Sequence, residues 1–246
     1  MSSRHALNAR RVFLQAAAAA ALAGSLPLAA LAQGGAAAKM KIGTIGSGRV
    51  GSAIGAAWVK AGHEVMFSSL DLDADKRLAA SLGRGVRAGT AREAAAFGTV
   101  LLVAVPYAAL PGVGRDLGDL IKGKIIIDTS NPIVGRDGDM AVAAREKGAG
   151  IASSEFLPGA RLVRAFNAIG AARMAAAAGS SERVGMPIAG DDAEAIRVAS
   201  ALIRDVGYEP VLVGTLAAMG KYLIPGTPLS GERSADEVRK VAATLK

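Results

Sequence analysis

Short apolar runs alternate along the chain with stretches in which apolar and polar positions follow a helical spacing. The run at 99–105 is apolar nearly throughout and stops at Pro106, and the run at 124–128 repeats that pattern. Because both faces of such a run are apolar, each predicts a strand buried on both sides of a parallel sheet. Further strands are expected at 40–46, 63–67, 161–166, 183–189 and 210–213.

Helices are expected at 52–61, 74–82 and 192–206, with Gly62 and Gly83 as left-handed caps of the first two. Strands that alternate with helices predict an α/β fold of the Rossmann type, a doubly wound parallel sheet. We expect a single domain over 40–214, followed by a short C-terminal helical tail over 215–246.

The first 32 residues differ from the rest. They contain Arg4, Arg10 and Arg11 and no acid, and an apolar run over 16–32 ends in an A-x-A pattern. This order is typical of an export signal, and residues 10–15 resemble the twin-arginine motif. A membrane anchor needs about 20 strongly apolar residues, whereas this run is short and contains Pro27. We expect cleavage after Ala32, a linker over 33–39 and a periplasmic protein. Without such a signal the protein would be cytoplasmic.

The composition excludes several classes of protein. With 51% hydrophobic and 20% charged residues the chain is globular, and its lack of cysteine excludes disulfides, thiol nucleophiles and cysteine zinc sites. Only His63 lies in the expected domain, so we expect no metal site, and Asp192 should cap a helix rather than bind metal. The net charge of +8 is dispersed, so we expect neither nucleic-acid binding nor stable membrane insertion.

A glycine-rich turn follows the first expected strand. It reads Gly46-Ser47-Gly48-Arg49-Val50-Gly51, a G-x-G-x-x-G motif between a strand and a helix. Gly46 would allow a tight turn, Gly48 would let the backbone approach a pyrophosphate, and Gly51 would let helix and strand pack closely. Unpaired N–H groups at the helix start would bind the anion. The alternative is a glycine-rich turn without a ligand.

The end of the second expected strand bears on the choice of cofactor. An NAD site usually has an acid there, whereas this chain has Ser68 and Ser69, whose hydroxyls can donate to a 2′-phosphate. We therefore favour NADP over NAD. Asp71 would be the ribose acid if the strand ran longer. The cations available for a 2′-phosphate are Arg49, Lys76 and Arg77.

Several phrases together resemble the NADPH-dependent deazaflavin (coenzyme F-420) reductase family, whose fold also forms the cytoplasmic domain of the STEAP metalloreductases. Besides the glycine motif they are VAVP at 103–106, IDTSNP at 127–132, LPGARLVRAFN at 157–167, AGDD at 189–192 and DVGYEP at 205–210. The resemblance covers about 40–228, and the Ala165-Phe166-Asn167 phrase is its most specific part.

The resemblance implies a set of cofactor-binding residues at the carboxyl ends of the strands. Ser68 and Ser69 would face the 2′-phosphate, Val105 and Pro106 the nicotinamide ribose, and Asn131, Ala165 and Asn167 the nicotinamide, while Gly46, Ser47, Gly48, Arg49, Val50 and Gly51 would surround the pyrophosphate. The family usually carries an arginine beside the serine, where this chain has Ser69 or Leu70. That difference weakens the expected preference for NADP unless Lys76 or Arg77 compensates.

The resemblance implies hydride transfer between NADP and a flavin-like or deazaflavin (coenzyme F-420) acceptor, with no catalytic acid or base. His63 is expected to be structural, and Tyr107 either stacks on a second ring or covers the sheet. One alternative is a small carbonyl or imine reductase, although these usually carry a helical second domain. Another is a nucleotide-binding protein without turnover, for which export gives some support. The 215–246 tail could dock on a second copy and form a homodimer.

Overall fold

The computed structural model describes residues 39–176 and 183–245, and Lys39–Lys246 cluster as one compact unit. The expected export signal at 1–32 and linker residues 33–38 lie outside the described residues. No described helix has the length and apolar character needed to cross a bilayer.

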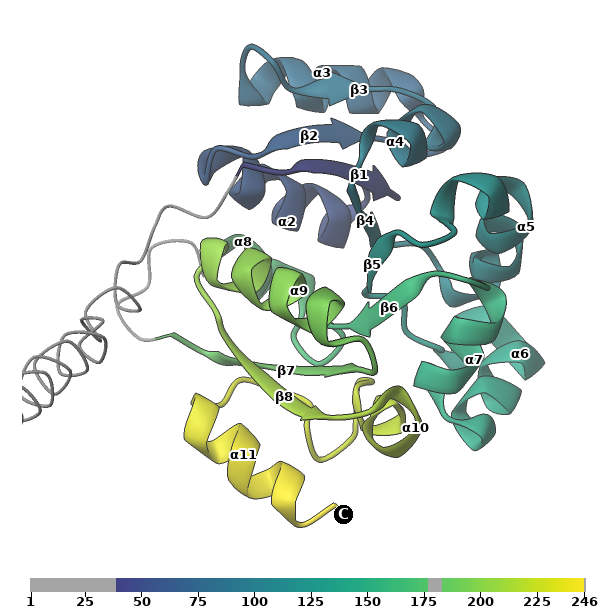
Figure 1. The fold of residues 1–246 in the computed structure, drawn as a ribbon, viewed down its shortest axis with the longest axis vertical. Helices are drawn as coiled ribbons and strands as arrows, with labels where there is room; N and C mark the ends of the chain where they lie inside the picture. The colour runs from purple at the N-terminus through teal and green to yellow at the C-terminus, as the bar shows by residue number, and fades with distance from the viewer. Residues whose placement is uncertain (1–38, 177–182, 246) are drawn as a thin grey trace, which may run out of the picture. The chain divides into compact units, whose positions relative to one another are not determined.

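Eight described strands form one sheet in the order β3-β2-β1-β4-β5-β6-β7-β8 (Figure 1). All neighbouring pairs are parallel except β6 and β7. The strands are β1 (Lys41–Ile45), β2 (Glu64–Phe67), β3 (Arg87–Ala88), β4 (Val100–Val103), β5 (Ile125–Asp128), β6 (Arg161–Arg164), β7 (Gly185–Gly190) and β8 (Glu209–Gly214). The predicted Rossmann-type α/β fold is therefore confirmed.

Helices connect the strands, and several begin at clear capping residues. Asp192 accepts a hydrogen bond from the Ala195 N–H at 2.8 Å, as expected for the cap of α9. The helices are α2 (Arg49–Lys60), α3 (Leu72–Leu82), α4 (Ala91–Phe97), α5 (Leu110–Ile121), α6 (Val134–Lys147), α7 (Ala149–Phe156), α8 (Ala171–Ala176), α9 (Ala193–Asp205), α10 (Leu216–Met219) and α11 (Ala235–Ala243), with short 3₁₀ turns at Tyr107–Ala109 and Gly220–Tyr222.

The central strands are buried on both faces, which explains their continuous apolar runs. In β4, Leu102 belongs to a core cluster that contains Trp58 of α2 and Leu202 of α9. Its neighbour Leu101 belongs to a second cluster that contains Ile121 of α5. Adjacent strand residues point to opposite faces of a sheet, so helices pack on both sides, as a doubly wound fold requires. The indole N–H of Trp58 donates to the Leu202 carbonyl at 2.8 Å and ties α2 to α9.

Two features of the sheet differ from the expectation. The two-residue β3 has no apolar run and was not predicted from the pattern. β7 is antiparallel to β6, with Arg164 opposite Ala189, although an all-parallel sheet was expected. A parallel partner needs a crossover that returns along the sheet, usually a helix. The described part of this connection contains only the six-residue α8, so β7 runs back from the edge where β6 ends.

Candidate functional site

The glycine-rich turn lies between the end of β1 and the start of α2. Gly46 has a φ of +97°, and a Cβ there would lie 2.4 Å from the Ala104 carbonyl oxygen. A Cβ on Gly51 would lie 1.9 Å from the Gly46 carbonyl oxygen. Both positions therefore require glycine for the turn to pack against the end of β4 and the start of the helix.

Gly48 differs from these two glycines because no neighbouring protein atom would clash with a side chain at this position. Its φ is −64°, and a Cβ there would have nothing within 4 Å. It precedes α2, whose first turn has no side-chain cap and no acid. The first N–H groups of a helix lack partners within the helix. The space next to Gly48 therefore fits an anionic group close to the backbone, such as a pyrophosphate.

Two cavities meet at Gly48 and at the residues that follow β4. They share Gly48, Ala104, Val105 and Pro106. One cavity, of about 1040 Å³, extends toward the end of β2, and we call it the adenosine-end cavity. The other, of about 540 Å³, extends toward the ends of β5 and β6, and we call it the nicotinamide-end cavity. A molecule that spans both would pass the start of α2.

The adenosine-end cavity is lined by Ser68, Ser69 and Leu70. The Ser68 side chain is buried, and its hydroxyl donates to the Thr44 carbonyl oxygen at 2.5 Å. The Ser69 hydroxyl donates to Asp75 at 2.8 Å, and Leu70 is fully exposed. Each serine hydroxyl already has a protein acceptor.

The cations near this cavity are not those that the sequence suggested. Neither Lys76 nor Arg77 lines it, whereas Arg92 and Arg115 do. Arg92 forms a bidentate ion pair with Asp119, with two hydrogen bonds of 2.8 and 3.2 Å. Arg92 lies in the first turn of α4, just after β3. A prediction of β3 from the sequence would have placed Arg92 at this edge of the sheet.

Asp71, the alternative ribose acid, lies beyond the strand. β2 ends at Phe67, and Asp71 is the N-cap of α3, where its carboxylate accepts from the Ala74 N–H at 2.9 Å. It lines the adenosine-end cavity, but as part of the following helix.

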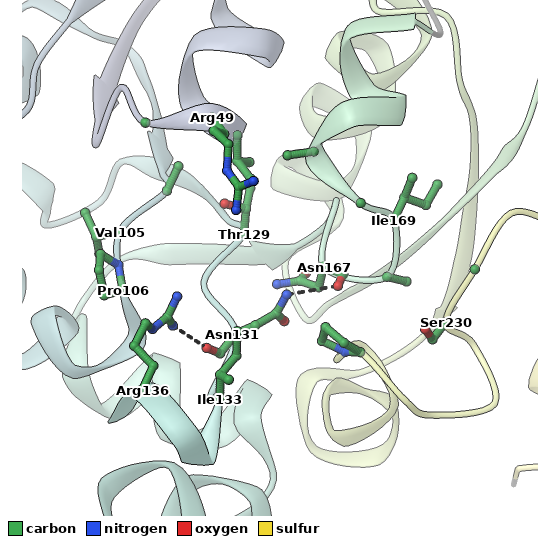
Figure 2. A pocket seen from close by; sticks show the side chains of 18 residues that line it. Arg49, Val105, Pro106, Thr129, Asn131, Ile133, Arg136, Asn167, Ile169 and Ser230 are labelled. Carbon is green, nitrogen blue, oxygen red and sulfur yellow. Dashed lines mark hydrogen bonds between the residues drawn. The ribbon is translucent and has the colours of Figure 1, made fainter. Parts of the chain in front are cut away.

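The nicotinamide-end cavity gathers side chains from the ends of three neighbouring strands (Figure 2). Val105 and Pro106 come from the loop after β4, Asn131 from the loop after β5, and Asn167 from the loop after β6. Ala165 is fully buried and does not line the cavity. Phe166 explains this placement, because its φ of +63° reverses the chain after Ala165 and directs Asn167 toward the cavity.

Two residues of the cavity lining have hydrogen-bond acceptors without a partner among the described residues. The Asn131 side-chain N–H donates to the Asn167 backbone carbonyl at 3.0 Å, and the Asn167 side-chain N–H donates to the Ser130 carbonyl at 3.3 Å. Among the residues that the structure describes, the amide oxygens of both asparagines are buried without a partner. A buried acceptor without a donor is costly, so both oxygens fit a ligand that brings N–H or O–H groups.

Two arginines lie on the wall of the nicotinamide-end cavity (Figure 2). Arg49 is exposed. Arg136 donates to the Asn131 carbonyl at 2.8 Å and pairs with Asp137. Burial acts to raise the pKa of Asp137, but hydrogen bonds from Arg136 and from the N–H groups of Ile133 and Ala108 outweigh it and lower the pKa. Asp137 therefore stays ionised and partly neutralises Arg136.

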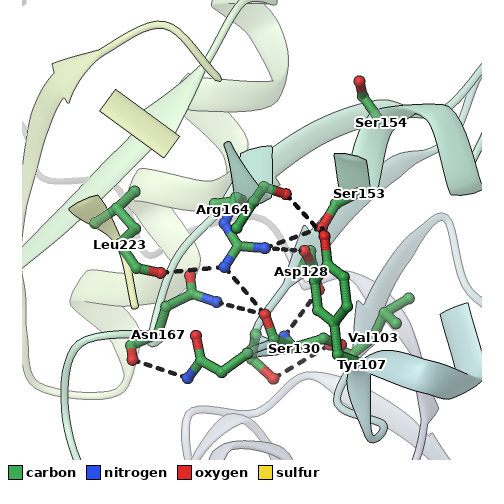
Figure 3. Close-up of polar contacts among 12 residues, drawn as sticks. Val103, Tyr107, Asp128, Ser130, Ser153, Ser154, Arg164, Asn167 and Leu223 are labelled. Atoms are coloured by element: carbon green, nitrogen blue, oxygen red, sulfur yellow. Dashed lines mark hydrogen bonds and ion pairs between the residues drawn. The ribbon is translucent and has the colours of Figure 1, made fainter. Parts of the chain in front are cut away.

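A buried polar network lies next to the nicotinamide end (Figure 3). Arg164 and Asp128 are both fully buried and pair at 2.5 Å. Arg164 also donates to the carbonyls of Ser130 and Leu223, at 3.0 and 3.1 Å, and to the Ser153 hydroxyl at 3.0 Å. Asp128 accepts from the Ser130 N–H at 2.8 Å. This network fixes the loop that carries Asn131. The sequence indicated that Asp128, at the end of its strand, orients backbone groups near Asn131, but it did not reveal the part of Arg164.

Tyr107 belongs to this network rather than to the cavity. It is fully buried, its hydroxyl donates to the Ala149 carbonyl at 3.1 Å, and it accepts from Ser153 at 3.2 Å. Burial raises the pKa of Tyr107. Of the two expected roles, the side chain therefore covers the sheet.

His63 is structural, as expected. Its Nδ1 accepts from the Met40 N–H at 3.1 Å, and its Nε2 lies 3.0 Å from a carboxylate oxygen of Asp205. These bonds tie the start of β2 to the end of α9, away from the carboxyl ends of the central strands. Within the described ranges, no group of three potential metal ligands is found.

Several known proteins are similar to this chain. Residues 41–132 match the family described as "NADP oxidoreductase coenzyme F420-dependent". Metalloreductase STEAP3 of Rattus norvegicus is 30% identical over 181 residues, which are 72% of this chain and 34% of that protein. The chain thus spans about a third of the length of this curated relative. These two matches support the resemblance drawn from the sequence.

Solved structures share the fold. A hypothetical protein from Sinorhizobium meliloti is 26% identical, with a TM-score of 0.67 over 80% of this chain and 95% of its own. An imine reductase from Myxococcus stipitatus, in complex with NAD+, is 17% identical, with a TM-score of 0.55 over 84% of this chain and 60% of its own. At that identity the second likeness shows the fold alone.

Proposed function

We propose that this protein is an NADP(H)-dependent oxidoreductase that transfers hydride between the nicotinamide and a flavin-like or deazaflavin (coenzyme F-420) acceptor. The observation that carries this proposal is Gly48, a glycine without steric need, at the uncapped start of α2 where the two cavities join. A dinucleotide has the matching form, with a pyrophosphate between two rings.

The chain's own residues bind and orient such a cofactor. The free N–H groups at the start of α2 hold the pyrophosphate, and Val105 and Pro106 border the nicotinamide ribose. The amide oxygens of Asn131 and Asn167 accept hydrogen bonds from the nicotinamide end, which fixes the orientation of the ring. When bound, the nicotinamide supplies the hydride.

Preference for the phosphorylated cofactor rests on the adenosine-end cavity. The strand end carries Ser68 and Ser69 in place of an acid, and Arg92 and Arg115 line the same cavity. The two arginines favour a phosphate over a bare hydroxyl, whereas both serine hydroxyls already donate to protein acceptors. We infer NADP as the main cofactor on this basis.

The nature of the acceptor follows from the lining of the nicotinamide-end cavity. Among its described lining residues none is His, Cys, Asp, Glu, Lys or Tyr, so none serves as a general acid near neutral pH. Reduction of a carbonyl or imine needs a proton donor at the reacting group, whereas a flavin-like ring can exchange its proton with solvent. Arg49 and Arg136 favour an acceptor that carries negative charge.

The experiment is anaerobic stopped-flow oxidation of NADPH, followed by the absorbance of the reduced nicotinamide. FMN, FAD and a deazaflavin form one panel of acceptors, and small ketones and cyclic imines form the other. We expect turnover with the first panel only. Turnover with the second panel alone would replace this function with a carbonyl or imine reductase. Tight NADPH binding without turnover in either panel would identify a nucleotide-binding protein.

We also propose export before function, because residues 1–32 resemble a twin-arginine signal. That route moves folded proteins, so the cofactor could be loaded before export. Mass spectrometry of the native protein should find an N-terminus at Gln33 together with a bound nucleotide, and an intact N-terminus would contradict export.

A homodimer through the C-terminal tail is a further prediction. Val238 and Ala242 of α11 are buried in the protein's own core, so the tail has less apolar surface for a second copy than its sequence suggested. Light scattering tests this prediction, and a monomer would contradict it.

A further inference from the structure

Asp75 connects the glycine-rich turn to the loop that follows β2. It lies in the first turn of α3 and is 1% exposed. One carboxylate oxygen accepts from the Ser69 hydroxyl at 2.8 Å, and the other accepts from the Ser47 hydroxyl. The carboxylate thus joins the glycine-rich turn to Ser69, which lines the adenosine-end cavity, whereas Asp75 itself lies behind Ser69 and is not part of the lining.

These bonds use the donors that a 2′-phosphate would need. A serine hydroxyl has one proton to donate, and Ser47 and Ser69 both give theirs to Asp75. If the two hydroxyls turned to a phosphate, the buried carboxylate would lose both donors, which is costly for a charged group. A bare 2′-hydroxyl does not need these two serine donors, because it can itself donate a hydrogen bond as well as accept one.

The charge of Asp75 also disfavours a bound 2′-phosphate. A carboxylate near a 2′-phosphate repels it, and the neighbouring Leu70 is fully exposed and brings no positive charge. Lys76, the next residue after Asp75, pairs instead with Asp73 at 3.3 Å. On the other wall of the cavity, Arg92 and Arg115 pair with Asp119 and Asp116.

We propose that Asp75 is a specificity-determining residue, which limits the affinity of the site for the 2′-phosphate of NADPH relative to NADH. The proposal rests on the proposed function, since it concerns the same nucleotide site. It places the acid that acts on the 2′ position, through Ser69 and through its charge, in the first turn of α3 rather than at the end of β2.

The test compares dissociation constants for NADPH and NADH, measured by titrating the fluorescence of the reduced nicotinamide. In Asp75→Asn the geometry is kept and the charge is removed, so NADPH should bind about tenfold more tightly while NADH changes by less than about twofold. Asp73→Asn removes the same charge from the same turn, at a side chain that is 77% exposed. In this control the ratio of the two constants should stay unchanged.

Asp71→Asn tests the other acid, since asparagine also caps a helix well. If the ratio shifts in Asp71→Asn and not in Asp75→Asn, the proposal is wrong. An unchanged ratio in a folded Asp75→Asn would overturn it as well. A wild-type protein that binds neither nucleotide would instead contradict the proposed function, so the two failures are distinguishable.

Ser69→Ala provides a test that keeps the carboxylate, for the case in which Asp75→Asn does not fold. If the Ser69 hydroxyl donates its hydrogen bond to Asp75 also in the complex, removal of this hydroxyl should weaken NADPH binding by less than about threefold. A loss of about tenfold or more, as expected for a lost hydrogen bond to a charged group, would show that the hydroxyl serves the phosphate and would overturn the proposal.

Discussion

The two ends of the proposed nucleotide site are built in opposite ways. At the nicotinamide end, Arg164 and Asp128 are fully buried and hold the loop after β5, while the amide oxygens of Asn131 and Asn167 lack partners within the described residues. At the adenosine end, Ser69 lies on a partly exposed loop and already has its acceptor in Asp75. The first end is held by buried charged groups and has unpartnered acceptors among the described residues, whereas the serine hydroxyls of the second end have protein acceptors without a ligand.

This difference indicates a division of roles. A reacting ring must be held within a narrow range of positions, which needs residues fixed by a supporting layer. Cofactor choice needs only a difference in affinity between two ligands. In the proposed function, the buried network therefore serves orientation at the nicotinamide end, and the serines with Asp75 are proposed to set affinity at the adenosine end.

The largest expected effect comes from breaking the buried pair. Arg164→Met leaves the Asp128 carboxylate buried without its cation, so the free energy of unfolding should fall by about 3–5 kcal/mol in urea denaturation. Arg161→Met, on the same strand, removes a half-exposed pair with Asp192 and should cost much less. Similar losses in both variants would mean that the pair does not support the nicotinamide end.

The next effect concerns orientation alone. Asn167→Ala removes one free acceptor, so the rate of hydride transfer should fall about tenfold to a hundredfold, the range expected when a buried donor is left without its acceptor. The dissociation constant of NADPH should change little, because the pyrophosphate and adenosine contacts remain. Ser230→Ala, in the wall of the same cavity, is the control and should keep the rate. An unchanged rate in Asn167→Ala would remove the distinction between the two ends.

A smaller effect is expected when charge is added at the adenosine end. Ser69→Asp places a second carboxylate next to Asp75, so NADPH binding should weaken about tenfold relative to NADH. Ser81→Asp adds the same charge to the exposed end of α3 and should leave both affinities unchanged. Continued preference for NADPH in Ser69→Asp would mean that this loop does not read the 2′ position.

The smallest effect concerns stability in acid, outside both ends. The hydrogen bond from Arg161, followed by the Ala195 N–H, lowers the pKa of Asp192 to about 2. A lowered pKa in the folded state gives stability that is present above the unfolded value of about 3.9 and is lost as the pH falls toward 2. In Asp192→Asn, which keeps the cap, denaturation curves between pH 4 and pH 2 should show a smaller loss than in the wild type. Equal losses would assign the acid sensitivity to other carboxylates.

The sequence predicted the parts of the site that depend on neighbouring residues. The turn from Gly46 to Gly51 and the apolar central strands are local patterns, and both appear in the structure. Arg164 and Asp128 lie 36 residues apart, and Ser47 and Asp75 lie 28 apart. No local pattern reveals such pairs, because they form only when segments far apart in the sequence meet at one edge of the sheet.

Ala165 shows a second limit of local reasoning. A strand was expected to continue through 166, with Ala165 near the nicotinamide. The left-handed backbone of Phe166 instead buries Ala165 and turns Asn167 to the cavity. A non-glycine residue rarely adopts that conformation, so nothing in the local sequence indicated the turn. The antiparallel pairing of β7 escaped prediction because direction depends on the connection between the strands.

The central claim is that a dinucleotide pyrophosphate lies against Gly48. The most direct measurement is isothermal titration of NADPH into the wild type and Gly48→Val, with Gly118→Val as a control at another position where a Cβ meets no atom within 4 Å. We predict that Gly48→Val melts like the wild type but binds NADPH at least about a hundredfold more weakly, whereas the control binds normally. An unchanged titration curve for a folded Gly48→Val would contradict the claim.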